Sequence, residues 1–162
     1  MNNEISYFTG NETLIDDIEE LWIQLNQVHF EKSLDFKHRY KDFTFRQRKQ
    51  SLFSRAGKGK LFIVIAYDRD KKIGYCVSSV VDNIGEIDSI YVKPNYRKQR
   101  IGSALVEKSL DWIHSRNDVT DVTIKVAAGN EEAFGFYAKY GFRPIFTELQ
   151  KPKSQGGSRD DG

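Results

Sequence analysis

The stretch that decides the fold of this chain is Val92-Lys93-Pro94-Asn95-Tyr96-Arg97-Lys98-Gln99-Arg100-Ile101-Gly102-Ser103-Ala104. It joins an apolar, strand-like run to a segment whose apolar residues recur at helical spacing. The first amide groups of a helix have no partner within it, and with the helix dipole they favour a bound anion. Gly102 lets a ligand approach the backbone closely. Arg97, Lys98 and Arg100 add positive charge. These features suit a pyrophosphate, whereas composition alone also allows a basic surface turn before an ordinary helix.

Three strands are expected before this stretch. Residues 61–67, 73–81 and 86–92 are rich in β-branched and aromatic residues, and short turns separate them. Short turns between consecutive strands indicate antiparallel hairpins.

Two helices are expected before the strands. Apolar residues at helical spacing predict a first helix from Leu14 to about Phe30, with Thr13 as its N-cap. Thr44 begins a capping-box pattern that predicts a second, shorter helix. The charged and aromatic residues 31–43 between them are expected to be irregular.

The chain after the basic stretch alternates between helix and strand. A helix should follow Arg100, then a strand over residues 119–126 and a helix capped by Asn130 that runs to Tyr140 and stops at Gly141. A last strand is expected over residues 142–149. A strand–helix–strand unit needs a parallel pairing. The expected fold is therefore α/β (α+β), with a mixed, mostly antiparallel central sheet flanked by helices. We expect one domain over residues 1–150 and a flexible C-terminal tail over 151–162.

Composition excludes several classes of protein. The formal net charge of +2, with acidic and basic residues interspersed, argues against nucleic acid as the main partner. The single cysteine, Cys76, allows no intrachain disulfide and suits a small buried apolar position. The start of the chain has no signal-peptide pattern, and no run of 18 apolar residues suggests a membrane span. Three scattered histidines predict no metal site. A cytoplasmic location without membrane attachment is expected.

Two motifs indicate a family. Val92-Lys93-Pro94 and Tyr96-Arg97 form the first, and a helix carrying Asn130, Ala133, Phe136, Tyr137, Lys139, Gly141 and Phe142 forms the second. From Glu86 to Phe142 the chain resembles the GCN5-related N-acetyltransferase (GNAT) superfamily. The acyl-CoA signature of that superfamily is arginine or glutamine, two residues, glycine, one residue, then glycine or alanine.

The signature fits this chain in two registers. Anchored on Val92 and Pro94, it begins at Arg97, and Arg100 then stands where the first glycine is expected. The letters also fit from Gln99 to Ala104, two residues later. The first register is preferred because it keeps the length of the loop after the strand.

The resemblance implies an enzyme that transfers an acetyl group from acetyl-CoA to a primary amine by direct attack, without a metal. A non-catalytic acyl-CoA-binding or regulatory module on the same fold is the alternative, and homodimers are frequent among such proteins. Backbone N–H groups near residues 90–92 should hold the thioester carbonyl. The residues that the resemblance places at acetyl-CoA are Ile90, Tyr91, Val92, Arg97, Lys98, Gln99, Arg100, Ile101, Gly102, Ser103, Asn130, Phe136, Tyr137 and Lys139.

Acyl transfer to an amine needs a group that removes a proton, because a lysine-like amine has a pKa of about 10.4. The resemblance implies that Glu86 is this base. Asp88, two residues on and facing the same side of the strand, is a second candidate, and a water is a third. The alternative is that these carboxylates face solvent or pair with Lys or Arg. The resemblance also implies that Tyr137 protonates the departing thiolate, and this role is preferred to the alternative that Tyr137 only belongs to an apolar helix stripe.

The acceptor site is expected near an aromatic group formed by His29, Phe30, Phe36, Tyr40 and Phe43. Together with Glu86 and the acidic face of the first helix (Asp16, Asp17, Glu19 and Glu20), these residues suit a cationic amine such as a polyamine, an aminoglycoside or a peptide amine. A solvated helix face is the simpler explanation of the acidic residues. The sequence does not identify which amine is the acceptor.

Overall fold

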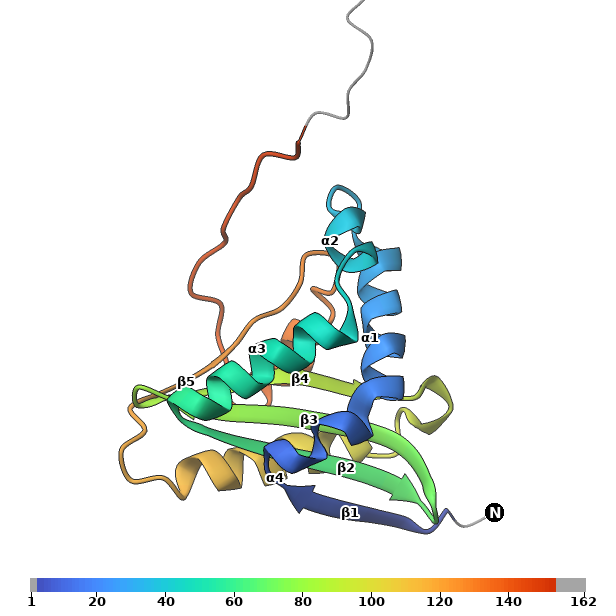
Figure 1. Ribbon diagram of the computed structural model, residues 1–162, viewed down its shortest axis with the longest axis vertical. Coiled ribbons are helices and arrows are strands. Elements are labelled where there is room, and N and C mark those ends of the chain that lie inside the picture. The colour runs from blue at the N-terminus through green and yellow to red at the C-terminus, as the bar shows by residue number, and fades with distance from the viewer. Residues whose placement is uncertain (1–2, 154–162) are drawn as a thin grey trace, which may run out of the picture.

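The computed structural model describes residues 3–153, and its centre is a five-stranded sheet with helices on both faces (Figure 1). The elements before the basic stretch are β1 (Ile5–Gly10), the 3-10 helix η1 (Glu12–Ile18), α1 (Glu19–Lys32), α2 (Lys37–Lys41), α3 (Phe45–Lys58), β2 (Lys60–Asp68), β3 (Lys71–Val81) and β4 (Ile84–Val92). Those that follow are the 3-10 helix η2 (Pro94–Tyr96), α4 (Ile101–His114), β5 (Asp121–Ile124) and α5 (Ala133–Ala138).

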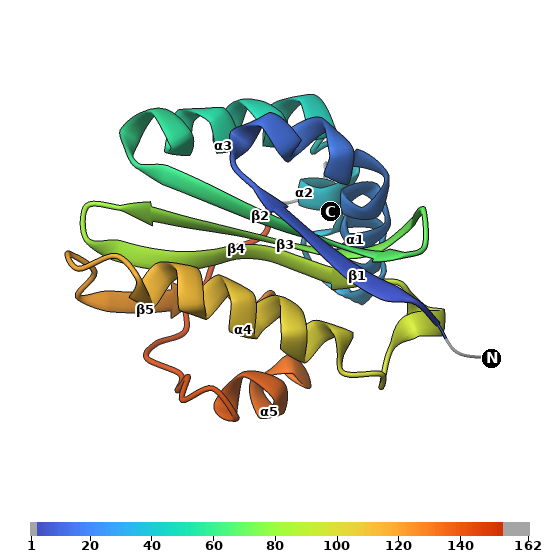
Figure 2. The same cartoon turned by 90° about the horizontal axis from the view of Figure 1, so that it is seen from below.

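The strands lie in the order β1-β2-β3-β4-β5. The first four pair antiparallel, and β5 pairs parallel to β4, because α4 crosses over between them. The expected mixed, mostly antiparallel sheet is therefore confirmed. Figure 2 shows the sheet nearly edge-on, with α1, α2 and α3 on one side and α4 and α5 on the other.

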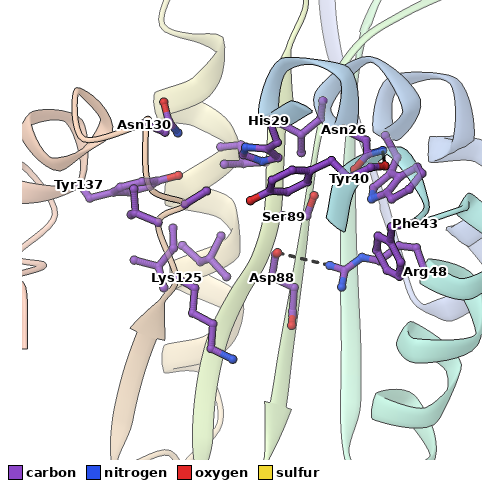
Figure 3. Close-up of a pocket in the computed structure, with 17 residues that line it drawn as sticks. Asn26, His29, Tyr40, Phe43, Arg48, Asp88, Ser89, Lys125, Asn130 and Tyr137 are labelled. Atoms are coloured by element: carbon purple, nitrogen blue, oxygen red, sulfur yellow. Dashed lines mark hydrogen bonds between the residues drawn. The ribbon is translucent and has the colours of Figure 1, made fainter. Parts of the chain in front are cut away.

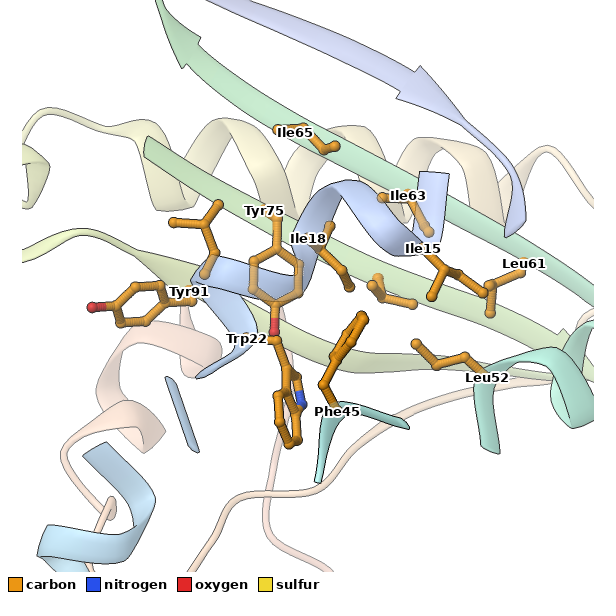
Figure 4. Close-up of a cluster of buried hydrophobic side chains, with 12 residues drawn as sticks. Ile15, Ile18, Trp22, Phe45, Leu52, Leu61, Ile63, Ile65, Tyr75 and Tyr91 are labelled. Atoms are coloured by element: carbon orange, nitrogen blue, oxygen red, sulfur yellow. The ribbon is translucent and has the colours of Figure 1, made fainter. Parts of the chain in front are cut away.

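The α1/α3 face of the sheet holds the first core. Trp22 of α1 packs between Phe43 and Phe45, with ring centroids 5.6 Å from each. Leu52 of α3 is fully buried in the same cluster, together with residues of β2 and β3 (Figure 4). The expected capping box of α3 is present: Thr44 Oγ accepts from Gln47 N at 3.2 Å, and Gln47 Oε1 accepts from Thr44 N at 2.9 Å.

The other face is covered mainly by α4. Its stripe of Ile101, Leu105, Val106, Ser109 and Ile113 is buried, and the helix expected after Arg100 is present. Cys76 of β3 lies fully buried under this face, as a small apolar position should.

The N-terminal third differs from expectation. Strand β1 was not expected, because an edge strand of mixed polarity carries no clear period. The helical segment begins earlier than Leu14, at Glu12, and its cap is Asn11 rather than Thr13: Asn11 Oδ1 accepts from Thr13 N at 3.0 Å. Its first turns are a 3-10 helix, and the segment expected to be irregular contains α2.

The C-terminal part differs more. Strand β5 covers only Asp121–Ile124, and α5 covers only Ala133–Ala138. Asn130 does not cap α5 with its side chain, because its Oδ1 accepts from Lys32 Nζ of α1 at 3.1 Å. Gly141 does end the helical segment, with φ of 90°. The strand expected over residues 142–149 does not form, and residues 151–153 have no regular structure. The rest of the expected tail, 154–162, lies outside the described residues.

The basic stretch between β4 and α4 takes an unusual backbone. Lys98 and Arg100 have left-handed φ values of 61° and 62°. Arg100 is the residue just before α4, the position where the preferred register expects glycine. A non-glycine residue is strained there because its Cβ crowds the backbone.

Replacing Arg100 with glycine should stabilise the protein. Relief of left-handed strain contributes about 1–2 kcal/mol, and the extra freedom of glycine in the unfolded chain costs about 0.5–1 kcal/mol. The Arg100→Gly variant should therefore gain about 0.5–1 kcal/mol in free energy of unfolding, measured by urea denaturation.

Glu107→Gly is the matched control, because Glu107 is an exposed residue inside the same helix. It should lose about 1 kcal/mol. Equal destabilisation by both changes would show that Arg100 is not strained.

Candidate active site

A pocket opens where β4 and β5 separate. Their pairing ends at Ile87 and Ile124, so the edge of β4 that faces β5 is unpaired from Asp88 onward. Helices α1, α2 and α3 close one side of the pocket and α5 the other (Figure 3). The lining residues are Trp22, Leu25, Asn26, His29, Tyr40, Phe43, Arg48, Ile87, Asp88, Ser89, Ile90, Ile124, Lys125, Val126, Ala127, Asn130 and Tyr137.

Strand β4 carries a bulge at the pocket. Ser89 pairs with Val77 and Ile87 pairs with Ser78, so Asp88 has no partner on β3. A bulge frees backbone groups and redirects side chains. The carbonyl of Asp88 accepts from Arg48 Nη2 of α3 at 3.3 Å instead (Figure 3).

Arg55 of α3 holds both candidate carboxylates. Its Nη2 lies 2.8 Å from Glu86 Oε2, and its Nε lies 3.1 Å from Asp88 Oδ1. Their side chains are 13% and 5% exposed, respectively. The two residues therefore do face one guanidinium, although Asp88 is the bulged residue of β4.

The two carboxylates differ in environment. Glu86 has a second cation, Lys125 Nζ, at 3.7 Å and does not line the pocket. Asp88 lines the pocket, and its Oδ2 is buried with no hydrogen-bond partner among the described residues. Burial raises the pKa of Asp88 to about 6, with Glu86 adding a smaller upward push against the opposing effect of Arg55.

Tyr137 stands on the α5 wall, across the pocket from Arg48 and Phe43 (Figure 3). The residue is 8% exposed, and burial raises the pKa of its hydroxyl above the usual range. Its hydroxyl donates no hydrogen bond to any described residue. It is therefore a protonated donor at neutral pH that faces the pocket.

Only part of the expected acceptor group reaches the pocket. His29, Tyr40 and Phe43 line it, with the rings of His29 and Tyr40 stacked at 5.5 Å. Burial and nearby Lys32 lower the pKa of His29. Phe30 and Phe36 are not among the lining residues.

The acidic face of the first helix lies elsewhere. Asp16, Asp17 and Glu20 pair with lysines of neighbouring elements. Asp16 and Glu20 are exposed and Asp17 is partly exposed, and neither they nor Glu19 lines the pocket. The solvated-face explanation therefore fits these residues better than an acidic groove.

Polar contacts hold the loop from β5 to α5 against the C-terminal end of α1. Lys32 Nζ binds Asn130 Oδ1, and it also pairs with Glu132. Gly129, with φ of 94°, lies so close to the backbone of Lys32 that a Cβ would come within 2.5 Å of the Lys32 oxygen. Asn130 thus positions a wall of the pocket.

The expected pyrophosphate loop presents unpaired amides. The backbone hydrogen bonds of α4 begin at Ala104 N, which donates to Arg100 O at 3.1 Å, so the first-turn amides of Ile101, Gly102 and Ser103 have no helical acceptor. Alternating left-handed residues, here Lys98 and Arg100, turn successive amides toward one side.

The side chains of the loop are held in different ways. Arg97 Nε donates to Val92 O at 3.1 Å, and the guanidinium lies 5.8 Å from the ring centroid of Tyr91. Tyr96 Oη donates to Asp68 at 2.7 Å, and Gln99 Nε2 donates to Asn95 O at 3.3 Å. Lys98 and Arg100 are exposed and make no ion pair among the described residues.

The remaining expected contacts divide into backbone and surface positions. The side chain of Ile101 is buried and Tyr91 is 6% exposed, so only their backbones can reach a ligand. Phe136 lies over Gly102, where an added Cβ would meet its ring at 3.7 Å. Ile90 and Val92 pack partly buried, and Lys139 is exposed at the end of α5. The unpaired amides at the start of α4 and the exposed Lys98 and Arg100 suit the phosphates of an acyl-CoA, and the pocket beside β4 suits its acyl end.

Sequence reasoning missed Arg48, Arg55 and Lys125. Arg48 and Arg55 flank Leu52 on the inner stripe of α3, so basic residues on the apolar face of a predicted helix were the available signal. Lys125 could not be singled out from the sequence, because it lies just after the end of β5 and that end was expected at Val126.

Among the described residues, no helix is long and apolar enough to cross a membrane. Residues 3–153 also bring no three potential metal ligands together.

Comparisons with known proteins identify the family of this chain. The model of the acetyltransferase (GNAT) family matches residues 17–142. The chain is 29% identical over 126 residues to the peptidyl-lysine N-acetyltransferase YjaB of Salmonella typhimurium, covering 75% of this chain and 79% of the relative. It is 31% identical over 71 residues to a Bacillus subtilis protein described as a putative [ribosomal protein bS18]-alanine N-acetyltransferase, and this match spans 44% of the chain and 46% of the relative.

The fold also matches a solved structure, the PaiA N-acetyltransferase of Thermoplasma acidophilum in complex with coenzyme A. The TM-score is 0.69 at 16% identity, covering 90% of this chain and 93% of that one. Since the family model covers well over half of the chain, this chain belongs to the acetyltransferase (GNAT) family and is an acyltransferase.

Proposed function

We propose that the chain transfers an acetyl group from acetyl-CoA to a primary amine by direct attack, with Asp88 as base and Tyr137 as acid. The observation that carries this proposal is the pocket between β4 and β5, which has Asp88 on one wall and Tyr137 on another. It lies at the end of the strand that leads into the amide-rich loop, where the CoA pyrophosphate would bind.

Each group has one task. The amine nitrogen forms a bond to the thioester carbon, and its proton passes to the Asp88 carboxylate directly or through a water. The carbon–sulfur bond breaks, and Tyr137 gives its proton to the sulfur. Unpaired N–H groups on the open edge of β4 stabilise the carbonyl oxygen as negative charge develops. Glu86 pairs with Arg55 and Lys125 and does not act as the base. Its negative charge beside Asp88 helps to raise the pKa of Asp88.

A base with a raised pKa predicts the pH dependence of the reaction. Asp88 must be deprotonated to act, so kcat/KM should rise with pH, with an inflection near the Asp88 pKa of about 6. Asp88→Asn should remove this inflection and lower the plateau by about 10²-fold or more, as measured by CoA release across pH.

Two variants are the controls. Glu86→Gln removes a negative charge that raises the pKa of Asp88, so the inflection should move to lower pH with activity retained. His29→Gln should keep the inflection, although His29 also titrates below its usual pKa in this pocket. An inflection that survives in Asp88→Asn and vanishes in His29→Gln would assign the base to His29.

Tyr137→Phe tests the acid. A thiol has a pKa of about 8.5, so the thiolate leaves without much help, and kcat should fall roughly ten- to hundredfold while the Kd for acetyl-CoA stays nearly constant. Tyr140→Phe is the matched control on the following turn, and it should keep the wild-type kcat. Equal kcat values for the two variants would contradict the role of Tyr137.

For the acceptor, we propose a primary amine on an aliphatic stem, such as a lysine side chain in a peptide. Trp22, Tyr40 and Phe43 offer apolar walls for such a stem. Asp88 is the one acidic residue among the described residues that line the pocket, beside the cations Arg48 and Lys125, so a polycation is less suited. Two relatives are named as peptidyl-lysine N-acetyltransferases, which supports a lysine side chain as the acceptor.

A mass-shift screen tests the whole proposal. The protein is incubated with acetyl-CoA and pools of lysine peptides, alanine-terminated peptides, polyamines and aminoglycosides. A lysine peptide should gain one acetyl group, and Asp88→Asn should suppress the gain. Stabilisation of the fold by acetyl-CoA without acetylation of any amine would support the non-catalytic module instead.

A further inference from the structure

Basic residues gather in the part of the chain that forms α2 and the start of α3. Residues 37–49 contain six lysines or arginines and one acidic residue, whereas the whole chain contains 25 basic and 23 acidic residues. Like charges this close in space repel one another, and an excess of one sign on a surface attracts a partner of the opposite sign. The six basic residues are Lys37, Arg39, Lys41, Arg46, Arg48 and Lys49.

Three of these six cations are available to a partner. Arg39, Lys41 and Arg46 are exposed, and their side chains make no ion pair or hydrogen bond within residues 3–153. The other three already bind carbonyls of α1 and β4 or a carboxylate of η1. We call Arg39, Lys41 and Arg46 the basic rim.

The basic rim borders the pocket on the side of α2 and α3. Tyr40 lies between Arg39 and Lys41 in the sequence, and its ring points into the pocket (Figure 3). Phe43, three residues before Arg46, also lines the pocket. The rim cations therefore lie next to the wall of the pocket but outside it, where they can contact a chain that enters the pocket with one side chain.

Helix α2 is held firmly enough to present the rim. Lys37 Nζ donates to Phe30 O at 2.8 Å and to Glu31 O at 3.2 Å, at the end of α1. Asn26 Nδ2 of α1 donates to Tyr40 O at 2.8 Å. Figure 1 shows α2 beside the end of α1 and just before α3. A surface that is ordered before its partner arrives loses less entropy on binding.

We propose that the basic rim binds carboxylates that flank the acceptor lysine, so that the preferred acceptor is a lysine in an acidic peptide segment. This inference rests on the proposed transfer to a lysine side chain. An acidic peptide supplies both the amine for the pocket and the negative charge for the rim. A nucleic acid would supply the charge without an aliphatic amine.

Matched peptides test the preference. Three peptides share one central lysine, which is flanked by glutamate, by glutamine or by arginine. The value of kcat/KM, measured by CoA release, should be about tenfold higher for the glutamate peptide than for the glutamine peptide, because each exposed ion pair contributes little. The difference should shrink as salt is added, since salt screens exposed charges. Equal values for these two peptides at low salt would overturn the proposal.

Charge reversal locates the preference on the rim. The double variant Arg39→Glu/Lys41→Glu should favour the arginine peptide over the glutamate peptide. Lys58→Glu/Lys60→Glu is the matched control, because it changes the net charge equally at exposed positions around the far end of α3, where Lys58 is about 18 Å along the helix from Arg46. This control should keep the wild-type preference. The same loss of preference in both double variants would assign it to net charge and overturn the proposal.

Binding without turnover separates this inference from the proposed function. The probe is a labelled glutamate peptide that carries acetyl-lysine in place of lysine, and its Kd is measured by fluorescence anisotropy. The Kd should rise about tenfold in Arg39→Glu/Lys41→Glu and stay constant in Lys58→Glu/Lys60→Glu.

The outcomes of the two assays differ. Binding that depends on the rim, without acetylation of any lysine peptide, would leave the rim as an acidic-peptide site and reject transfer to lysine. Acetylation of lysine peptides with no effect of the rim on rate or binding would do the opposite. An RNA oligonucleotide that displaces the peptide and binds more tightly through the same residues would overturn the proposal in favour of a nucleic acid.

Discussion

The candidate site depends on one constraint, the limited pairing between β4 and β5. These parallel strands share only the register from Ile84–Asp121 to Ile87–Ile124. Beyond that point β4 continues to pair with β3, whereas β5 turns away into the loop that Lys32 ties to α1. The separation opens the pocket and frees one edge of β4. Strand β4 then runs into the loop whose amides stand at the start of α4. The pocket and the amide-rich loop therefore both lie along the part of the chain that begins where β4 and β5 separate.

The charges around Asp88 follow from the same divergence and from the bulge. Two largely buried carboxylates on one strand would repel each other, and Arg55, which pairs with both, offsets part of that cost. Because of the bulge, the carbonyl of Asp88 has no hydrogen-bond donor on β3, and Arg48 donates to it instead. Because Asp88 keeps one oxygen without a partner, burial outweighs the nearby cations and the carboxyl holds its proton at a higher pH than usual.

Local signals in the sequence were enough for most of the framework. The hairpins, the crossover helix and the amide-rich loop each have a short-range pattern, and all of them form. The β4 bulge and the role of Arg55 could not be predicted, because both depend on the register between β3 and β4 and on where α3 crosses it. Residues 142–149 show the opposite case. Their β propensity is real, but a strand also needs an edge, and that is a property of the assembled fold.

Arg100 shows how such a conflict can be tolerated. The backbone before α4 needs a left-handed residue to direct the first amides outward, and glycine would adopt it without strain. Arginine costs more there, yet it adds a cation beside amides that already favour an anion. The strain falls on the folded state alone, whereas in the proposed site the charge would attract a bound phosphate. A loop of this kind exchanges some stability of the free protein for attraction of its ligand, and it depends on α4 packing firmly enough on β3 and β4 to hold the strained residue in place.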